Sequence, residues 1–397
     1  MNEPGPEAGS CRPPLALYVH IPWCVRKCPY CDFNSHAVRD TLPERAYVDA
    51  LLRDLGLELD ALGAGVQPLV SVFIGGGTPS LLSGAGMTRL LAGIRQRLPL
   101  DDATEITLEA NPGTADAANF AFYREAGINR LSLGVQSLDP VKLQALGRIH
   151  GPQEVYQAFW LARQAGFANI NLDLMYGLPE QDLRQARDDL LAALVLAPEH
   201  LSYYQLTPEP HTPFHAAPPP LPDEDLIAEM QLQGQELLTA AGFTSYEVAA
   251  HARPGHQCQH NLNYWTFGDY LGIGAGAHGK LTDPASGRIQ RGAKPKQPAA
   301  YLAAVDKAGP GLPPPGSTWT LAEDEVVLEF AMNSLRLTAG FPLRLFALNT
   351  GRSPDRLAAP LAAACQAGLL EVADDWVCPT ELGRRFLNDL IALFMDT

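Results

Sequence analysis

The stretch WCVRKCPYC, near the start of the chain, carries three cysteines in the spacing CxxxCxxC. Structural zinc sites take four ligands and commonly use two CxxC pairs, so Cys24, Cys28 and Cys31 leave zinc one ligand short. A cubane iron–sulfur cluster suits three thiolates, because its fourth iron then keeps an open position for a small molecule. The spacing therefore favours a [4Fe-4S] cluster. A zinc site completed by Cys258 or His36, or three ordinary buried thiols, remain the alternatives.

The other cysteines are scattered along the chain. The seven cysteines are Cys11, Cys24, Cys28, Cys31, Cys258, Cys365 and Cys378. The opening residues MNEPGPEAGSCRPP lack the basic start and apolar stretch of an export signal, and the ends of the chain carry no apolar run long enough to span a bilayer. We therefore expect a cytoplasmic protein without a transmembrane segment. Its reducing surroundings favour thiolate chemistry over disulfides.

Length and charge limit the kinds of fold and partner. The chain has 397 residues, which is long for one ordinary domain but fits an α/β barrel with an appendage. Its net charge is −15 and its sequence pI is about 5.1. A protein this acidic has no general attraction to phosphate backbones or anionic lipids. We therefore expect no nucleic-acid partner.

The elements that must position the cysteine loop alternate along the chain. Short β-branched and aromatic runs predict strands at 15–21, 69–74, 104–109, 129–135, 169–176 and 200–206. Stretches in which apolar residues return every three or four positions predict helices at 44–62, 81–98, 152–165 and 182–195. Strand and helix alternating about six times predicts parallel strands joined by crossover helices. The fold class is therefore α/β, with a full or partial β/α barrel.

The unusual stretches of the sequence fall at the ends of these predicted strands. The cysteine loop follows the first strand, GGGTPS the second, EANPG the third and GVQS the fourth, and DLMYGLP ends the fifth. Barrel chemistry collects at the carboxyl ends of the strands. We therefore expect these stretches to meet on one face of the barrel.

The rhythm changes after about residue 249. A segment rich in His, Gly, Asn and aromatic residues leads into RIQRGAKPK and then into AGPGLPPPGS, which is typical of a linker. Helices predicted at 321–337, 342–348 and 355–367 precede two short β-like runs and a last helix from residue 381, which indicates a small winged-helix-like α+β domain. The predicted division is a flexible N-terminus at 1–14, the barrel at 15–249, the His- and aromatic-rich segment with the linker at 250–317, and the small domain at 318–397.

Several motifs carry a resemblance to a known family. The stretch YVHIPWCVRKCPYCDF resembles the cluster loop of the radical S-adenosylmethionine (SAM) superfamily, and FIGGGTPSLL, LEANPG, RLSLGVQS, LGRIH and NLDLMYGLPEQ follow in the order seen in its oxygen-independent coproporphyrinogen III oxidase branch. The resemblance implies a partial (β/α)6 TIM-like radical SAM barrel. It also implies a [4Fe-4S] cluster held by Cys24, Cys28 and Cys31, with SAM on the open iron.

The resemblance further implies which residues contact SAM. Glycine lets the backbone approach a ligand closely, a carboxylate such as Glu109 can accept hydrogen bonds from ribose hydroxyls, and Arg148 offers a fork for a carboxylate. The implied cofactor-binding residues are Tyr18, Tyr30, Gly76, Gly77, Thr78, Glu109, Gln136, Arg148, Asp173 and Thr207. The implied chemistry is reductive cleavage of SAM to a 5'-deoxyadenosyl radical.

Two features separate the chain from the decarboxylating oxidase. The oxidase has a further cysteine two places after the third, where this chain has Phe33, and its N-terminal extension has no counterpart here. Instead, HNLNYW resembles the HNxxYW hallmark of the related haem chaperones, the HemW-like family. That resemblance implies a haem site at His260, Asn261, Tyr264 and Trp265, with His260 as a candidate iron ligand.

The residues downstream add two further candidates for haem contacts. GIGAGAHG supplies His278 as a second candidate ligand. A basic run could pair with the haem propionates, although a solvated loop is the favoured interpretation of it; it comprises Arg288, Arg291, Lys294 and Lys296.

Three functions are therefore under consideration. The preferred one is a haem chaperone that carries a cluster and SAM and passes haem to an unidentified acceptor protein, with an electron donor as a further partner. The alternative is an oxygen-independent coproporphyrinogen III oxidase. The third is a zinc or thiol protein whose winged-helix module contacts nucleic acid, for which Arg384 and Arg385 offer little support. The sequence assigns no catalytic residue.

Overall fold

The computed structural model describes residues 12–38, 41–63, 66–114, 117–309 and 312–395. Cys11 and most of the predicted flexible N-terminus lie outside the described residues. A curved sheet, built from twelve strands in the described part of the chain, runs through the molecule in the order β14-β13-β12-β11-β1-β4-β5-β6-β7-β8-β10-β9. The prediction of an α/β fold is confirmed.

Six strands in the middle of this sheet are parallel and follow the chain order. They are β1 (Leu15–Ile21), β4 (Leu69–Gly76), β5 (Glu105–Ala110), β6 (Arg130–Gln136), β7 (Ile170–Tyr176) and β8 (His200–Gln205). Each lies within two residues of its predicted bounds. Alternate residues on a strand point to opposite faces, so on β1 Leu17 and Val19 enter the main core while Tyr18 and His20 face the barrel interior.

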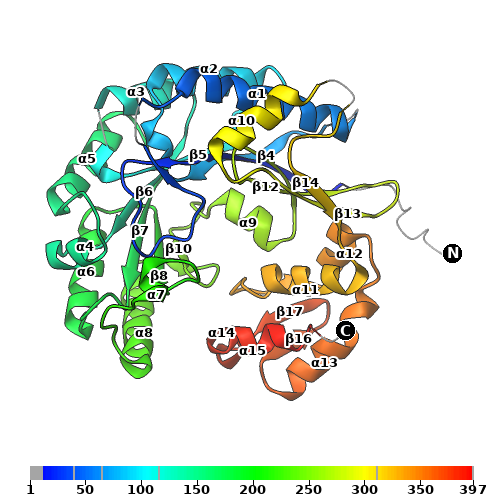
Figure 1. The fold of residues 1–397 in the computed structure, drawn as a ribbon. Helices are drawn as coiled ribbons and strands as arrows, with labels where there is room; N and C mark the ends of the chain where they lie inside the picture. Colours follow the sequence, from blue (N-terminus) through cyan, green and yellow to red (C-terminus); the bar gives the residue numbers. More distant parts are fainter. Residues whose placement is uncertain (1–11, 39–40, 64–65, 115–116, 310–311, 396–397) are drawn as a thin grey trace.

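Helices cover the outer face of this sheet (Figure 1). They are α1 (Glu44–Leu62), α2 (Gly84–Arg95), α3 (Ala117–Glu125), α4 (Pro140–Ala145), α5 (Pro152–Gln164), α6 (Leu183–Val195) and α8 (Glu224–Ala240). The chain thus forms the predicted partial β/α barrel, with the carboxyl ends of the parallel strands on one side.

The segment from residue 250 to 317 extends the same sheet. β10 (Ala250–Ala252) runs antiparallel to β8 and to β9 (Thr244–Ser245), and β11 (Asp269–Ile273) pairs in parallel with β1. β12 (His278–Thr282), β13 (Ile289–Ala293) and β14 (Ser317–Thr320) continue the sheet in antiparallel order. Between β10 and β11, α9 (Gln259–Trp265) lies on the inner side of the curved sheet (Figure 1). The division at 249 and 317 stays a prediction.

The basic run on β13 and beyond is only in part the solvated loop that the sequence favours. Lys294 is buried, and its Nζ lies 2.6 Å from Oδ1 of Asp54 on α1. Arg291 pairs with Glu329 and is mostly enclosed. The interpretation was wrong for these two residues because each belongs to an ion pair that joins the sheet to a helix.

A small C-terminal domain packs around a second hydrophobic core, to which Phe267 and Ile289 of the preceding segment also belong. It contains α11 (Glu323–Ser334), α12 (Arg344–Thr350), α13 (Ala358–Gln366), α14 (Glu381–Arg385) and α15 (Leu387–Ala392), with a sheet of β15 (Phe341–Pro342), β17 (Trp376–Pro379) and β16 (Leu370–Ala373). Helices followed by a small hairpin match the predicted α+β domain. In the described part of the chain, no helix has the length and apolarity needed to cross a membrane.

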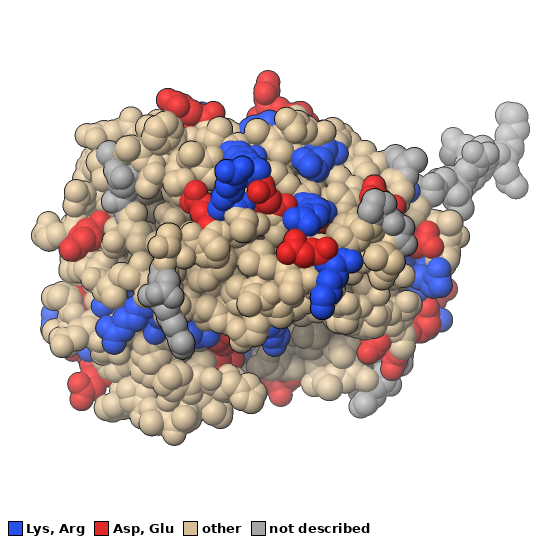
Figure 2. Space-filling view, turned by 45° about the horizontal axis from the view of Figure 1, so that its top comes forward, with Lys and Arg blue, Asp and Glu red and all other residues tan. Residues whose placement is uncertain are grey.

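The charged surface is mixed on the face seen in Figure 2. Lys and Arg side chains alternate there with Asp and Glu side chains. Among the exposed ion pairs of the chain are Arg53 with Asp306 and Arg89 with Asp49. This face therefore has no continuous basic surface of the kind that binds a phosphate backbone.

Candidate cluster and cofactor site

The three cysteines lie on one loop between β1 and α1. The loop is closed at its base by two short parallel strands, β2 (Trp23–Cys24) and β3 (His36–Ala37). The end of β4 holds the same base, since Gly77 N–H donates to the Ile21 carbonyl at 2.8 Å and Thr78 N–H to the Trp23 carbonyl at 2.7 Å. The glycine-rich end of the second predicted strand therefore fixes the start of the cysteine loop.

A cavity of about 480 Å³ opens between this loop and the carboxyl ends of the parallel strands; we call it the first cavity. It brings together most of the residues that the sequence predicted for the cluster and SAM. These are Cys24, Cys28, Tyr30, Cys31, Gly76, Gly77, Thr78, Glu109, Gln136, Arg148, Asp173 and Thr207. Residues more than 180 positions apart thus share one cavity because parallel strands end on the same side of the sheet.

The donor set fits a cluster better than a single metal ion. In the part of the chain that the structure describes, no three His, Cys, Asp or Glu side chains are grouped closely enough to hold one ion. Cys24, Cys28 and Cys31 are nevertheless free and all line the first cavity. Burial raises the pKa of the Cys24 and Cys31 thiols. A cluster would therefore have to displace protons when it binds.

Two glycines at the end of β4 are required by contacts within the protein. Gly76 has a φ of 118°, in the region that favours glycine, and a Cβ there would lie 2.7 Å from the His20 ring. A Cβ on Gly77 would lie 2.5 Å from the Trp23 carbonyl oxygen. Both glycines also line the cavity. The absence of a side chain at these two positions therefore allows close packing of the backbone and leaves the floor of the cavity open.

Glu109 is a buried carboxyl group on the floor of the cavity. Its Oε2 accepts a hydrogen bond from the Gly76 N–H at 3.0 Å. Burial, followed by the nearby Asp173, raises the pKa of Glu109 to about 8. An approaching ligand that donates hydrogen bonds or carries positive charge would favour the ionised form of this carboxyl.

Arg148 joins the cysteine loop to β6. Its Nη2 donates to the Gly134 carbonyl at 2.7 Å, and its Nη1 lies 3.7 Å from Sγ of Cys28. Its Nε is buried and has no hydrogen-bond partner among the described residues. A buried guanidinium with an unused donor is suited to hold a carboxylate.

Gln136 reaches the cavity through an irregularity at the end of β6. The register between β6 and β7 shifts between Gly134 and Gln136, and Gln136 has a φ of 71°, which is unusual for a residue with a side chain. Its Oε1 accepts from the Tyr204 hydroxyl at 2.6 Å. Nearby, Asp173 accepts hydrogen bonds from Ser132 on β6 and from Asn171 on its own strand, and burial raises its pKa.

The remaining predicted residues do not line the first cavity. Tyr18 lies instead on the wall of an adjoining cavity, the second cavity, which Tyr264, Tyr270 and His278 also line. In the haem motif, His260 is sealed in the barrel interior, where its Nδ1 contacts the Ser71 hydroxyl at 2.9 Å. Tyr264 lines the second cavity, whereas Trp265 lies under the Arg336 guanidinium, 4.4 Å from it.

Asn261 is half-buried in the first turn of α9. The four motif residues therefore face different surroundings rather than one shared site. Burial lowers the pKa of His260 to about 3, so its ring is neutral at physiological pH.

Sequence reasoning missed several residues of the first cavity. Asn111, Ser132 and Tyr204 also line it. Strand alternation could have found Ser132. It lies two positions before Gly134 and four before Gln136, so all three fall on the same face of β6.

Comparisons with known proteins show which families the chain resembles. Residues 18–191 match the radical SAM superfamily, and residues 321–386 match the HemN C-terminal domain. "Heme chaperone HemW" of Escherichia coli (strain K12) is 51% identical over 384 residues, covering 96% of this chain and 98% of that protein. The protein of the same description from Bacillus subtilis (strain 168) is 34% identical over 390 residues, covering 96% and 99%.

Among solved structures, coproporphyrinogen III oxidase (HemN) from Escherichia coli superposes with a TM-score of 0.81 at 24% identity, covering 97% of this chain and 91% of that one. This likeness shows the fold alone. The barrel and its three-cysteine loop thus define a radical SAM protein. The full-length similarity shows more: the chain belongs to the HemW heme chaperone family.

Proposed function

We propose that this protein binds haem and passes it to an acceptor protein, and that it carries a [4Fe-4S] cluster and SAM in the first cavity. The observation that carries the proposal is the meeting of three free thiols from one loop with Glu109 and Arg148 in a single cavity. Relatives that span nearly the whole chain are described as heme chaperones, which supports haem as the cargo. The acceptor and an electron donor are partners of unknown identity, and the cytoplasm is the proposed compartment.

The residues of the first cavity have separate roles in this proposal. Cys24, Cys28 and Cys31 would hold three irons, and the unused donor of Arg148 would pair with the carboxylate of SAM. Glu109 and Asp173 would accept hydrogen bonds from the nucleoside. A cluster with an open iron supplies one-electron reduction to a bound sulfonium.

The other residues of the cavity restrict access to this site. Tyr30 is largely enclosed beside Arg148, and its pKa is raised by burial. Gly76, Gly77 and Thr78 leave room for the cofactor at the strand end, and Gln136 and Thr207 complete the polar wall. Together they would orient SAM and limit the entry of water.

Of the haem-motif residues, Tyr264 is the one that can contact a macrocycle in the second cavity without movement of α9. His260 and Trp265 would reach haem only if the helix left its present contacts. Phe33, where the oxidase has a cysteine, lines both cavities and is exposed. The presence of Phe33 in place of that cysteine weighs against the oxidase as an alternative.

The test is anaerobic reconstitution of the full chain, followed by iron counting, absorption spectra, a haem titration and transfer to an apo-haemoprotein. We expect about four irons per chain, as a cubane requires, and stoichiometric haem binding. Cys28→Ala should lose the cluster and keep the fold, while the exposed Cys365→Ala should keep both. Conversion of coproporphyrinogen to a divinyl product, or copurified zinc without a cluster, would contradict the proposal.

A further inference from the structure

A second cavity, of about 640 Å³, adjoins the first. The two cavities share Lys27, Asp32, Phe33, Ser35, Gly76 and Glu109. The second has further walls from β1, α9, β11 and the start of β12. Its volume lies in the range of about 300–1,000 Å³ typical of pockets that hold small organic ligands. Of the residues that the sequence implied for the cluster and SAM, only Tyr18 lies on these further walls.

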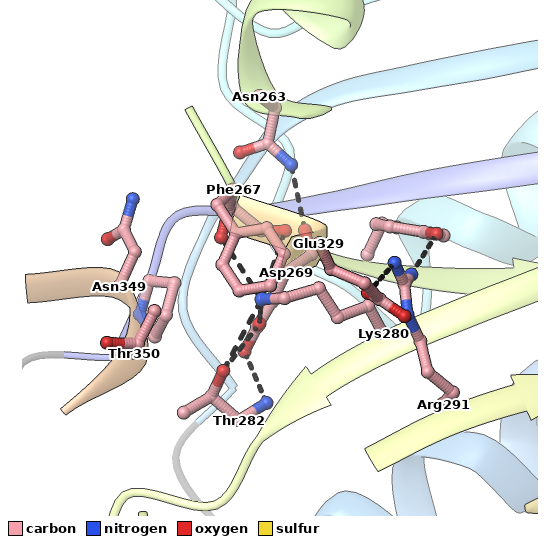
Figure 3. Close-up of polar contacts among 12 residues, drawn as sticks. Asn263, Phe267, Asp269, Lys280, Thr282, Arg291, Glu329, Asn349 and Thr350 are labelled. Atoms are coloured by element: carbon pink, nitrogen blue, oxygen red, sulfur yellow. Dashed lines mark hydrogen bonds and ion pairs between the residues drawn. The ribbon is translucent and has the colours of Figure 1, made fainter. Parts of the chain in front are cut away.

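Tyrosines supply flat surface on these walls. Tyr264 on α9 and Tyr270 on β11 lie edge to face, with ring centroids 4.4 Å apart, and Tyr18 on β1 lines the same cavity. Arg291 donates to the Tyr270 hydroxyl at 2.6 Å and pairs with Glu329 on α11 (Figure 3). The rings are therefore held in place, and fixed aromatic faces suit a planar macrocycle.

The position of α9 beside this cavity is fixed by a buried network, shown in Figure 3. Asn263 of α9 donates to the Asp269 carbonyl at 2.8 Å. Lys280 Nζ lies 2.8 Å from Oδ1 of Asp269 and 4.2 Å from the centroid of the Phe267 ring, and Thr282 donates to the same carboxylate. The cavity wall therefore exists before any ligand binds.

His278 stands at the edge of this cavity because of a tight glycine turn. Gly274 and Gly276, between β11 and β12, have φ values of 103° and 81°. A Cβ on Gly272 would overlap with the His278 carbonyl oxygen, so the close approach of the two strands requires glycine there too. The motif GIGAGAHG thus places one imidazole beside the cysteine loop.

Two other histidines that line the cavity already have partners. The ring of His20 contacts the Tyr18 hydroxyl at 3.0 Å and the Asn34 carbonyl at 2.8 Å. The ring of His36 contacts the Lys296 carbonyl at 3.3 Å. If His20 bound an iron, its ring would lose the contact with either the Tyr18 hydroxyl or the Asn34 carbonyl. If Nε2 of His36 bound an iron, it would lose its contact with the Lys296 carbonyl.

His278 differs from them and from His260. Its side chain is exposed, and its ring has no hydrogen-bond partner among the described residues. His260 is 1% exposed and does not line the cavity. An incoming macrocycle would therefore meet a free imidazole at His278 and not at His260.

The charges of the cavity favour one orientation of an anionic ligand. Its acidic residues, Asp32 and Glu109, belong to the wall shared with the first cavity, and burial raises the pKa of Glu109 to about 8. Lys296 belongs to the unshared wall, and its backbone is held by Asn34, whose Nδ2 donates to the Lys296 carbonyl at 2.9 Å. Lys27 lies on the shared wall, but its Nζ already donates to the Phe33 carbonyl. An anionic group of a ligand would therefore be expected to point toward Lys296.

We propose that the second cavity is the haem site of this protein, with His278 as the imidazole ligand of the iron and Lys296 as the partner of a propionate. This inference rests on the proposed function, because it assumes that haem is the cargo. It puts haem beside the SAM cavity, on the side of β11 and β12.

The experiment is a haem titration of the anaerobically reconstituted full chain, followed by absorption and electron paramagnetic resonance. His278→Ala should weaken haem binding at least tenfold and change the axial-ligand signature, and added imidazole should restore the signature. Cluster spectra and SAM binding should stay unchanged. His256→Ala, at a histidine that lines neither cavity, should behave as wild type.

Two further variants and an uncharged haem derivative distinguish the possible results of the titration. Lys296→Glu should weaken binding of haem several-fold but not of haem dimethyl ester, whose propionates carry no charge. Wild-type affinity and signature in His278→Ala, or their loss in His260→Ala alone, would overturn the inference. Failure of the wild-type protein to bind haem would instead overturn the proposed function.

Discussion

The guanidinium of Arg148 lies 3.7 Å from Sγ of Cys28, although 120 residues separate them in the chain. The same guanidinium donates to the Gly134 carbonyl, and its buried Nε has no partner among the described residues. One side chain therefore touches a proposed cluster ligand, the end of β6 and the space proposed for SAM.

Arg148→Gln should lower the affinity for SAM by about tenfold to a hundredfold, because a charged hydrogen bond contributes roughly 1.5–3 kcal/mol. The cluster should still form, since the three thiols are retained. Equilibrium dialysis of the reconstituted protein with SAM, beside an iron count, measures both. Arg187→Gln, at an exposed side chain beside Asp188, is the control and should match wild type. Unchanged SAM affinity in Arg148→Gln would remove this residue from the site.

Gly77→Ala should impair cluster assembly. The new Cβ would lie 2.5 Å from the Trp23 carbonyl, so the backbone must shift where Gly77 N–H holds the Ile21 carbonyl. We expect destabilisation by about 1–3 kcal/mol and a lower iron content after reconstitution. Gly56→Ala on α1 is the matched control. Nothing lies within 4 Å of its new Cβ, and a helix interior gains about 0.5–1 kcal/mol from this change. Equal iron content in the two variants would contradict the role given to the strand end.

Lys280→Met should destabilise the fold by about 3–5 kcal/mol, because it leaves the Asp269 carboxylate buried without its cation. Arg344→Met breaks an exposed pair with Asp375 and should cost less than about 1 kcal/mol. Chemical denaturation of both variants, monitored by circular dichroism, gives the comparison. Similar losses of unfolding free energy in the two variants would show that the buried Lys280–Asp269 pair contributes no more to stability than the exposed pair.

Acid should destabilise the protein partly through His260. Burial lowers the pKa of His260 from 6.5 to about 3, so the unfolded chain binds a proton between these values and the folded chain does not. The free energy of unfolding therefore falls as pH falls below 6.5, by about 1.4 kcal/mol between pH 7.5 and 5.5 for one such group. His260→Gln should reduce the drop over this interval by that amount. An unchanged drop in chemical denaturation at the two pH values would contradict the buried, neutral ring.

Local patterns accounted for most of the barrel. The six parallel strands follow short apolar runs, which can be recognised without knowing which strands pair with each other. The helix α1 matches its predicted range of 44–62. The second helix is shorter than the predicted 81–98, because Ser83 caps it by accepting from Gly86 N–H and the turn before it is a 3-10 helix, Pro79–Leu81. Apolar spacing does not reveal such a boundary.

The haem motif shows where a sequence pattern misleads about space. Six consecutive letters suggest one site, but α9 is a helix, and only residues three or four apart share a face. His260 and Tyr264 therefore lie edge to face with ring centroids 4.8 Å apart, while Trp265 turns toward the C-terminal domain.

The sequence by itself determined the cysteine spacing, the order of strands and helices, and the polar residues at the strand ends, because each depends on a few neighbouring positions. Only the tertiary structure decided which side chains share a cavity. The second cavity joins Tyr18, Tyr264 and His278, residues up to 260 positions apart, because β11 pairs with β1. Pairing between distant strands depends on packing of the whole sheet, which no local pattern contains.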